Sequence, residues 1–167
     1  MGVQIGRNAH GWSVNGVLVP DEPWRGHDGP FLAALFLTDD AEAVYERWRT
    51  QPGDFKTGNI HEARSGARVE AVVVFMRCQP DETGNCQVWG TATVEAGDGR
   101  VVARGVEVPL WVGRPPPPDP ALGIAEHGVA LVVDGASAPY SFRMLVTDRV
   151  AGREVKLVQE LTVQRSQ

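Results

Sequence analysis

The sequence has little of the features that mark several large classes of protein. It carries 16 Lys and Arg against 21 Asp and Glu, which gives a formal net charge of −5 and a pI near 5.3. An acidic chain without a basic stripe argues against a nucleic-acid partner. No run approaches about 18 apolar residues, so no membrane-spanning helix is expected. The Gly-x-Ser-x-Gly motif of a serine nucleophile is also missing.

Cysteine is scarce, with only Cys78 and Cys86 in the chain. They bracket a segment rich in Pro, Asp, Gly and Asn, the residues of a hairpin turn. We expect a disulfide between them, with two reduced thiols as the alternative. A structural zinc site is excluded because two cysteines without a nearby His cannot complete one. The N-terminus lacks the charged start and apolar stretch of a secretory signal. A disulfide nevertheless favours an oxidising compartment, so we predict a periplasmic or secreted protein, with the cytoplasm as the alternative.

Glycine and proline, in contrast, are abundant, at 19 and 12 residues, and they favour a fold with many turns. A chain of 167 residues with 43% hydrophobic content fits one domain with a good core. Alternation of apolar and polar residues, the period of a half-buried strand, is clearest at 129–133, 140–147 and 155–163. About seven or eight strands at roughly ten-residue spacing predict a mainly β fold, an antiparallel immunoglobulin-like β-sandwich, over residues 31–167.

The stretch from Arg68 to Glu95 is interpreted as a hairpin. If Cys78 and Cys86 face each other across it, paired positions sum to 164. Met76 then lies opposite Val88. This register assigns to the core one face, which holds Met76, Val74, Val72, Val88, Gly90 and Ala92. The other face holds Phe75 opposite Trp89. A shift of one residue would exchange the two faces, so the assignment of core and exposed residues depends on this register.

One short amphipathic helix is expected at residues 39–50, after a strand at 31–38. Asp39 stands at the N-cap position, with Glu42 three residues later, a variant of the capping box. The apolar positions of the segment repeat as one face of a helix: Ala41, Val44, Tyr45 and Trp48. Pro52 and Gly53 end it.

Residues 1–30 are rich in Gly, Asn, Asp and Pro. We interpret them as an N-terminal arm that packs on the domain or is partly disordered. Asn15-Gly16 is a tight-turn dipeptide, which predicts a small hairpin of residues 12–14 and 17–19. Trp12 and Trp24 are the expected anchors of the arm.

Two proline features organise the middle of the chain. Pro109 cannot donate a ladder hydrogen bond, so the strand that contains it is expected at a sheet edge. The run from Arg114 to Pro120 must be extended polyproline II. We interpret it as a stiff crossover between sheets, with a docking segment for a proline-reading partner as the alternative. A tight turn at residues 97–99 leads into the edge strand.

The segment from Asp134 to Gly152 resembles the closing hairpin of immunoglobulin-like sandwich domains in bacterial exported proteins. In that resemblance Tyr140 stands near the start of a strand, as in a tyrosine corner. Asp148 ends the same strand, before a turn that contains Gly152.

Residues 31–164 as a whole resemble a group of uncharacterised exported proteobacterial proteins. The shared features are a strand that ends in Leu37-Thr38, a short helix with a Trp, and an Asp-x-x-Gly-Asn loop, here Asp81 to Asn85. The resemblance implies a sandwich fold and export. It implies no activity, since fold alone does not give function.

The histidines do not form a metal motif. Only His27-Asp28 and His61-Glu62 place a carboxylate beside an imidazole, and neighbouring side chains on a strand point to opposite faces. We expect no metal and no cofactor. The alternative is a copper or zinc protein, or a small enzyme, with a site built from His10, His27 and His61 together with Asp54.

The aromatic residues suggest a contact surface. Phe75 and Trp89 fall on the face that the hairpin register leaves outside the core, and Trp111 shares the exposed side of its strand. An uncovered apolar patch of this kind marks a partner or a sugar platform. We therefore predict a non-catalytic binding or protein-interaction module, with a protein partner favoured over a glycan and with Phe75, Trp89 and Trp111 as its binding residues.

Overall fold

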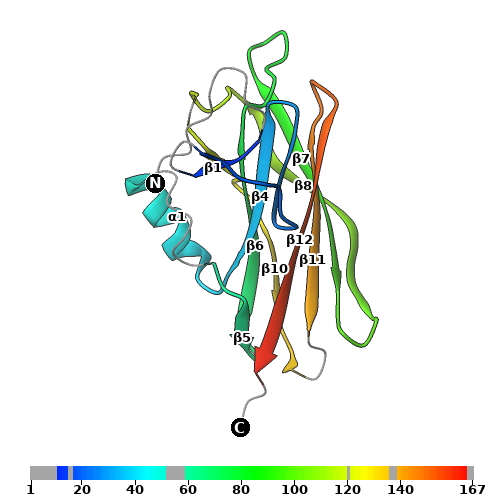
Figure 1. The fold of residues 1–167 in the computed structure, drawn as a ribbon. Helices are drawn as coiled ribbons and strands as arrows, with labels where there is room; N and C mark the ends of the chain where they lie inside the picture. Colours follow the sequence, from blue (N-terminus) through cyan, green and yellow to red (C-terminus); the bar gives the residue numbers. More distant parts are fainter. Residues whose placement is uncertain (1–10, 15–16, 52–58, 120, 136–138, 165–167) are drawn as a thin grey trace.

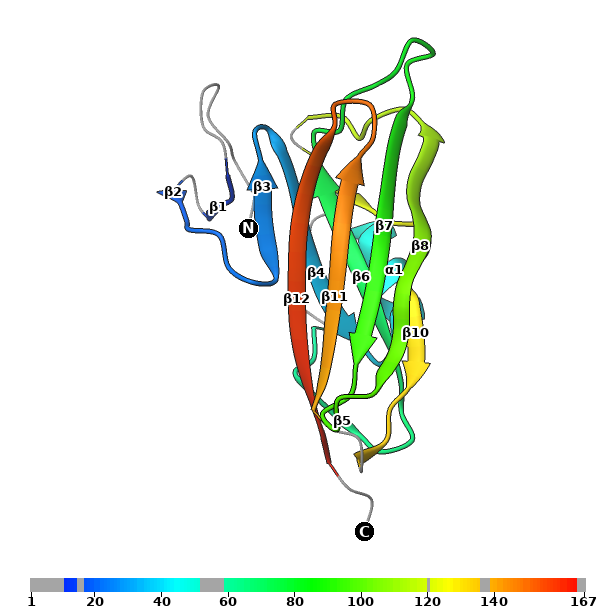
Figure 2. The ribbon, with the colours of Figure 1, turned by 90° about the vertical axis from the view of Figure 1, so that its right-hand side faces the viewer.

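A computed structural model of the chain describes residues 11–14, 17–51, 59–119, 121–135 and 139–164. Two five-stranded sheets lie face to face, with a small two-stranded hairpin beside them (Figures 1 and 2). The strands of the described residues pair antiparallel, except for one parallel pair between β5 and β12. The predicted mainly β sandwich is confirmed.

The first sheet has the order β10-β6-β4-β3, with β9 beside β6. Its strands are β3 (Arg25–Asp28), β4 (Phe31–Thr38), β6 (Arg68–Met76), β9 (Gly123–Ile124) and β10 (Val129–Val132).

The second sheet has the order β5-β12-β11-β7-β8. Its strands are β5 (Glu62–Arg64), β7 (Cys86–Glu95), β8 (Val101–Arg114), β11 (Tyr140–Asp148) and β12 (Arg153–Gln164). Outside the two sheets, β1 (Ser13–Val14) pairs with β2 (Val17–Leu18), and the helix α1 spans Ala41–Thr50.

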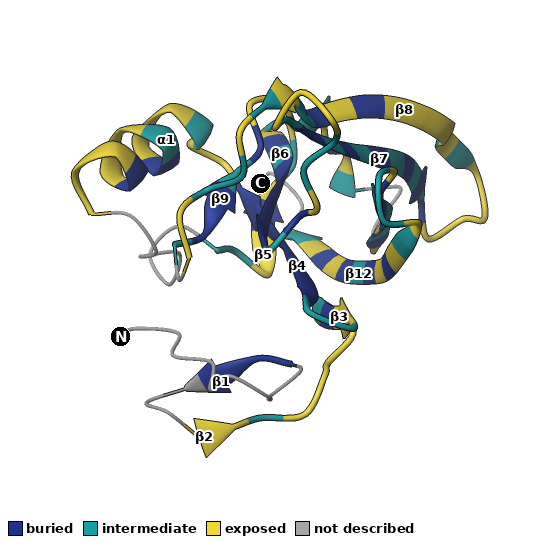
Figure 3. Ribbon diagram, turned by 90° about the horizontal axis from the view of Figure 1, so that it is seen from above, coloured by how far each residue is buried: buried dark blue, intermediate teal, exposed yellow. Residues whose placement is uncertain are grey.

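The central strands of the first sheet, β4 and β6, are covered on both faces, and this explains their continuous apolar sequences. All eight residues of β4 are buried. Alternate residues, Phe31 among them, face the second sheet and form the main core. The residues between them, such as Phe36, pack with Trp48 of α1 and Trp12 of the arm. Figure 3 shows α1 to one side of the sheets, with buried and exposed residues along it.

The second sheet is covered on one face only, and its strands alternate accordingly. Every second residue of β7 is buried, starting at Cys86. In β11 the buried residues include Tyr140, Phe142, Met144 and Val146, the face predicted from the sequence. The opposite face of this sheet is turned away from the core.

The disulfide between Cys78 and Cys86 is confirmed, with the two Cα atoms 6.0 Å apart. The predicted hairpin around it is wrong. β6 and β7 belong to different sheets, so the bond joins the two layers of the sandwich. Met76 pairs with Leu32 of β4, and Val88 pairs with residues of β8 and β11. On β6, the face predicted as exposed, with Phe75, packs in the main core. The face of β6 predicted as core, with Met76, is also buried, but in the cluster that includes α1 and the arm.

The helix lies where it was predicted, with Val44 and Trp48 buried. Its N-cap is Asp40 and not Asp39, since an oxygen of the Asp40 side chain accepts a hydrogen bond from the Ala43 N–H at 3.1 Å. That bond satisfies one of the free amides of the first turn. No helix among the described residues is long and apolar enough to span a membrane.

The described part of the arm packs on the first sheet. Trp12 is buried, and its indole N–H donates to the Gly26 carbonyl at 3.0 Å. Trp24 is partly buried against the same apolar cluster. The sequence did not predict β3, which extends the first sheet beyond β4.

Other local predictions also agree with the structure. Residues 115–119 cross from β8 in the second sheet toward β9 in the first. β8, which contains Pro109, lies at the edge of its sheet. The Tyr140 hydroxyl accepts a hydrogen bond from the Asp134 N–H at 2.9 Å, the backbone contact expected of a tyrosine corner.

Candidate functional site

A pocket of about 320 Å³ opens where the arm meets the second sheet. We call it the arm pocket. It is lined by Asp21, Glu22, Arg25, Gly26, His27, Glu154, Val155 and Lys156. Its walls come from two parts of the chain that are more than a hundred residues apart, the segment before and within β3 and the first half of β12.

Hydrogen bonds donated by the backbone of β12 fix the two walls of the arm pocket against each other. The Val158 N–H donates to the Pro23 carbonyl at 2.7 Å, and the Glu154 N–H donates to an Asp28 carboxylate oxygen at 3.0 Å. Between these contacts Gly26 faces Val155. A Cβ at Gly26 would lie 3.0 Å from the Val155 Cγ1 atom, so glycine allows the close approach.

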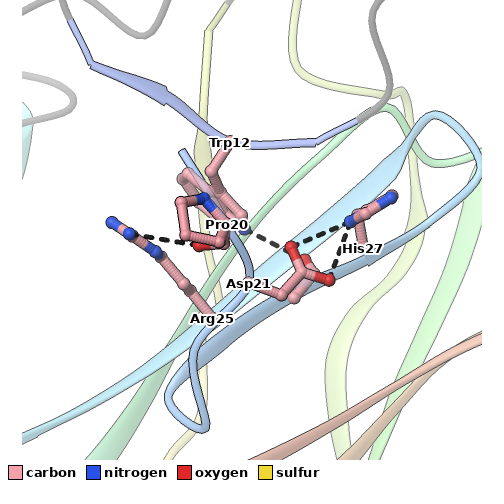
Figure 4. Close-up of polar contacts among 6 residues, drawn as sticks. Trp12, Pro20, Asp21, Arg25 and His27 are labelled. Atoms are coloured by element: carbon pink, nitrogen blue, oxygen red, sulfur yellow. Dashed lines mark hydrogen bonds and ion pairs between the residues drawn. The ribbon is translucent and has the colours of Figure 1, made fainter. Parts of the chain in front are cut away.

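The most organised side chains of the arm pocket are Asp21 and His27. The imidazole Nδ1 lies 2.9 and 2.8 Å from the two carboxylate oxygens of Asp21 (Figure 4). A carboxylate on Nδ1 favours the tautomer with the proton on that atom and leaves Nε2 as the acceptor. The pair is partly exposed, with 33% of the His27 side chain and 40% of the Asp21 side chain accessible. Such an imidazole can accept a proton or bind a metal through Nε2.

Arg25 and Glu22 form a second pair in the arm pocket, 3.3 Å apart. Glu22 also accepts a hydrogen bond from the Trp24 indole N–H at 2.8 Å. Arg25 donates to the Pro20 carbonyl at 3.2 Å (Figure 4) and lies over the Trp24 ring. Both charges are therefore held by contacts within the arm.

Of the predicted site residues, the structure describes His27 and His61, and it does not bring these two together. His10 and Asp54 lie outside the described residues. His27 lines the arm pocket beside residues 154–156, whereas the His61 carbonyl accepts from the Thr162 N–H. Seven residues of β12 separate these two places, which corresponds to about 23 Å along a strand. Among the described residues, no group of three or more His, Cys, Asp or Glu could hold a metal ion.

The prediction that Phe75, Trp89 and Trp111 form one exposed aromatic surface is wrong. Phe75 is fully buried in the main core. Trp111 pairs with the inward-facing Val88, and its ring centroid lies 5.3 Å from that of Phe75. Trp89 alternates with the buried residues of β7 and therefore lies on the other face of the sheet. Both tryptophans are partly exposed, on opposite sides of the second sheet.

Each partly exposed tryptophan is covered by an arginine that is itself paired with a glutamate. The Arg149 guanidinium lies 4.3 Å from the Trp89 ring centroid, and Glu107 holds it at 3.1 Å. Arg114 lies 3.7 Å from the Trp111 ring centroid and pairs with Glu126. The arrangement repeats that of Trp24 in the arm. A guanidinium over the ring occupies the surface on which a sugar would stack.

Sequence reasoning missed most of the arm pocket. It named His27 because Asp28 is the next residue in the sequence. In the structure the Asp28 carboxylate does not hydrogen-bond to His27 but accepts a hydrogen bond from the Glu154 N–H. The true partner, Asp21, is six residues upstream. Glu154 and Lys156 alternate with the core residues of β12, so their exposure could be predicted from the sequence. The position of these two residues beside the arm could not be predicted in this way.

No family model matches the chain, and no curated protein matches it. A solved structure with partial similarity is that of a family 123 glycoside hydrolase from Clostridium perfringens, with a TM-score of 0.39 and 8% sequence identity. The similarity covers 80% of this chain and 27% of that chain, so the protein spans about a quarter of that enzyme's length. At this level the likeness indicates nothing about activity.

Proposed function

We propose that the protein is an exported, non-catalytic binding module that recognises another protein at the arm pocket. The observation that carries the proposal is the pair Glu154 and Lys156. Both side chains are exposed at the pocket, and neither forms an ion pair with another described residue. Charges of both signs held on strands of a double-sheet scaffold suit the steering and orientation of a protein partner.

Two further observations support parts of this proposal. The disulfide between the sheets fits a protein that matures in an oxidising compartment, and its sulfur-bearing residues are buried, Cys86 completely. A protein partner is favoured over a glycan because Trp89 and Trp111 are covered by Arg149 and Arg114.

The proposal is tested by capture from an envelope extract of the source organism. Immobilised wild-type protein is compared with Lys156→Glu and with Arg104→Glu, which reverses an exposed charge on β8, outside the arm pocket. We expect at least one protein, quantified by mass spectrometry, to be retained by the wild type and by the β8 variant and lost with Lys156→Glu. Equal retention on all three, or retention on none, would contradict the proposal.

The second candidate function rests on the contact between Asp21 and His27. An imidazole oriented by a carboxylate at the mouth of a pocket is a suitable general base or metal ligand. Elemental analysis of protein purified without an affinity tag distinguishes this candidate. Stoichiometric copper or zinc that is lost in a His27→Asn variant would favour it over the binding module.

A further inference from the structure

Two charges of the arm pocket are left for a ligand. Six acidic or basic side chains line the pocket, and four of them are engaged with one another, as Asp21 with His27 and Glu22 with Arg25. Glu154 and Lys156 remain exposed, without an ion pair to any described residue. The selectivity of the pocket therefore depends on one carboxylate and one ammonium group.

The spacing of these two charges is that of an extended chain. Glu154 and Lys156 are two residues apart on β12 and flank the buried Val155, so their side chains leave the same face of the strand. Two steps of a strand correspond to about 6.6 Å. The same distance separates the side chains at positions i and i+2 of any other extended segment. A segment that lies along β12 can therefore place one side chain opposite each charge.

The length of the pocket also suits a short segment. The lining of the pocket on β12 runs from Glu154 to Lys156, which is two steps of a strand or about 6.6 Å. That length accommodates a segment of three extended residues. The volume of about 320 Å³ falls at the small end of the range for ligand pockets, which is about 300–1,000 Å³.

We propose that the arm pocket binds an extended protein segment that carries one basic and one acidic residue separated by a single residue. The basic side chain faces Glu154, and the acidic side chain faces Lys156. This assignment rests on the proposed function, since it names the partner chemistry of the same site. Exposed ion pairs add little affinity each, so the charges act mainly by selecting among segments.

The test uses three blocked five-residue peptides as probes: Ser-Lys-Ser-Glu-Ser, Ser-Glu-Ser-Glu-Ser and Ser-Lys-Ser-Lys-Ser. Binding to the full chain is followed by amide chemical shifts of Gly26, His27 and Lys156 in an NMR titration. We expect the mixed peptide to bind about two- to tenfold more tightly than either like-charged peptide, because each like-charged peptide exchanges one attractive pair for a repulsive one. A mixed peptide that binds no more tightly than the others would overturn the assignment.

Charge reversal gives a sharper result that does not depend on absolute affinity. Glu154→Lys should shift the preference to the acidic peptide, and Lys156→Glu should shift it to the basic one. Glu160→Lys reverses an exposed charge on the same face of β12, outside the pocket, and should keep the preference for the mixed peptide. An unchanged order of preference in the two pocket variants would overturn the assignment.

The outcomes separate this inference from the proposed function. If the peptides show no preference while Lys156→Glu still loses a captured envelope protein, the charge assignment is wrong and the binding module stands. If capture by the wild type and by Lys156→Glu is also the same, both are wrong.

Discussion

Removal of the bond between the two sheets should destabilise the protein by an amount that the loop length sets. The double variant Cys78→Ala, Cys86→Ala opens a loop whose ends are eight positions apart. In the chain-entropy model, closure of a loop of about nine residues contributes about 2.5 kcal/mol to the free energy of unfolding. Cys78 and Cys86 are 5% and 0% exposed, so the loss of two buried sulfur atoms adds to this value.

Urea denaturation followed by tryptophan fluorescence measures the effect. The double variant should show a lower midpoint with a slope that is not reduced, since an unfolded chain without the cross-link exposes at least as much surface. Wild-type protein that is unfolded and refolded in reductant keeps both sulfur atoms and should lose only the loop-closure contribution, so its stability should lie between those of the oxidised wild type and the double variant. Reductant should leave the double variant itself unaffected. A loss below about 1 kcal/mol would refute the loop-closure reasoning, because it is well under the entropic term alone.

Three other perturbations have definite expected results. Hydrogen bonds, first of all from the Thr83 side chain, lower the pKa of Asp81 from 3.8 to about 2, so the ionised carboxylate stabilises the fold above pH 4 and this stabilisation is lost as the pH falls toward 2. In the Asp81→Asn variant the free energy of unfolding should therefore depend less on pH between 4 and 2. Burial raises the pKa of Tyr45 from 10.0 to about 12, so stability should fall as the pH rises from 10 to 12, and the absorbance titration of the wild type should contain a late step that Tyr45→Phe removes. Gly123→Ala should lower the free energy of unfolding by about 1–3 kcal/mol in urea titrations, because its Cβ would lie 2.7 Å from the Phe75 ring; an unchanged midpoint would contradict this packing.

The sequence predicted the sandwich, the helix and the disulfide because each depends on a local pattern. Alternation along β11 and β12 reflects one covered face, and the apolar stripe of α1 after an acidic cap reflects a helix packed on a sheet, although the cap is Asp40 and not the predicted Asp39. The partner of β6 could not be read in the same way. Two cysteines eight residues apart are compatible both with a hairpin and with a crossing between layers, since both keep the sulfur atoms adjacent.

A signal against the hairpin was nevertheless present. From Val69 to Met76 the chain is apolar at nearly every position, which is typical of a strand covered on both faces. From Gln87 to Glu95 it alternates, which is typical of a strand with one solvated face. Two strands with such different patterns fit different sheets better than one.

The arm pocket was less predictable than the fold for a physical reason. Its walls meet because Pro23 and Asp28 bond to the edge of β12, and no periodicity in the sequence reports contacts between segments so far apart. Single polar residues in an arm, such as Asp21, carry no pattern that distinguishes a pocket from a solvated loop.

The edge strand β8 has a consequence for how the molecule behaves among copies of itself. Its pairing with β7 is interrupted by four irregularities of register, and Gly105 adopts a positive φ of 59°. Val102 and Val106 are exposed on this strand, at 42% and 45%. A straight, regular border with such side chains would invite another chain to add to it, as happens when fibres grow. The irregular edge of β8 does not offer the regular row of backbone amides that such pairing needs. The two exposed valines are therefore less prone to cause aggregation at high protein concentration.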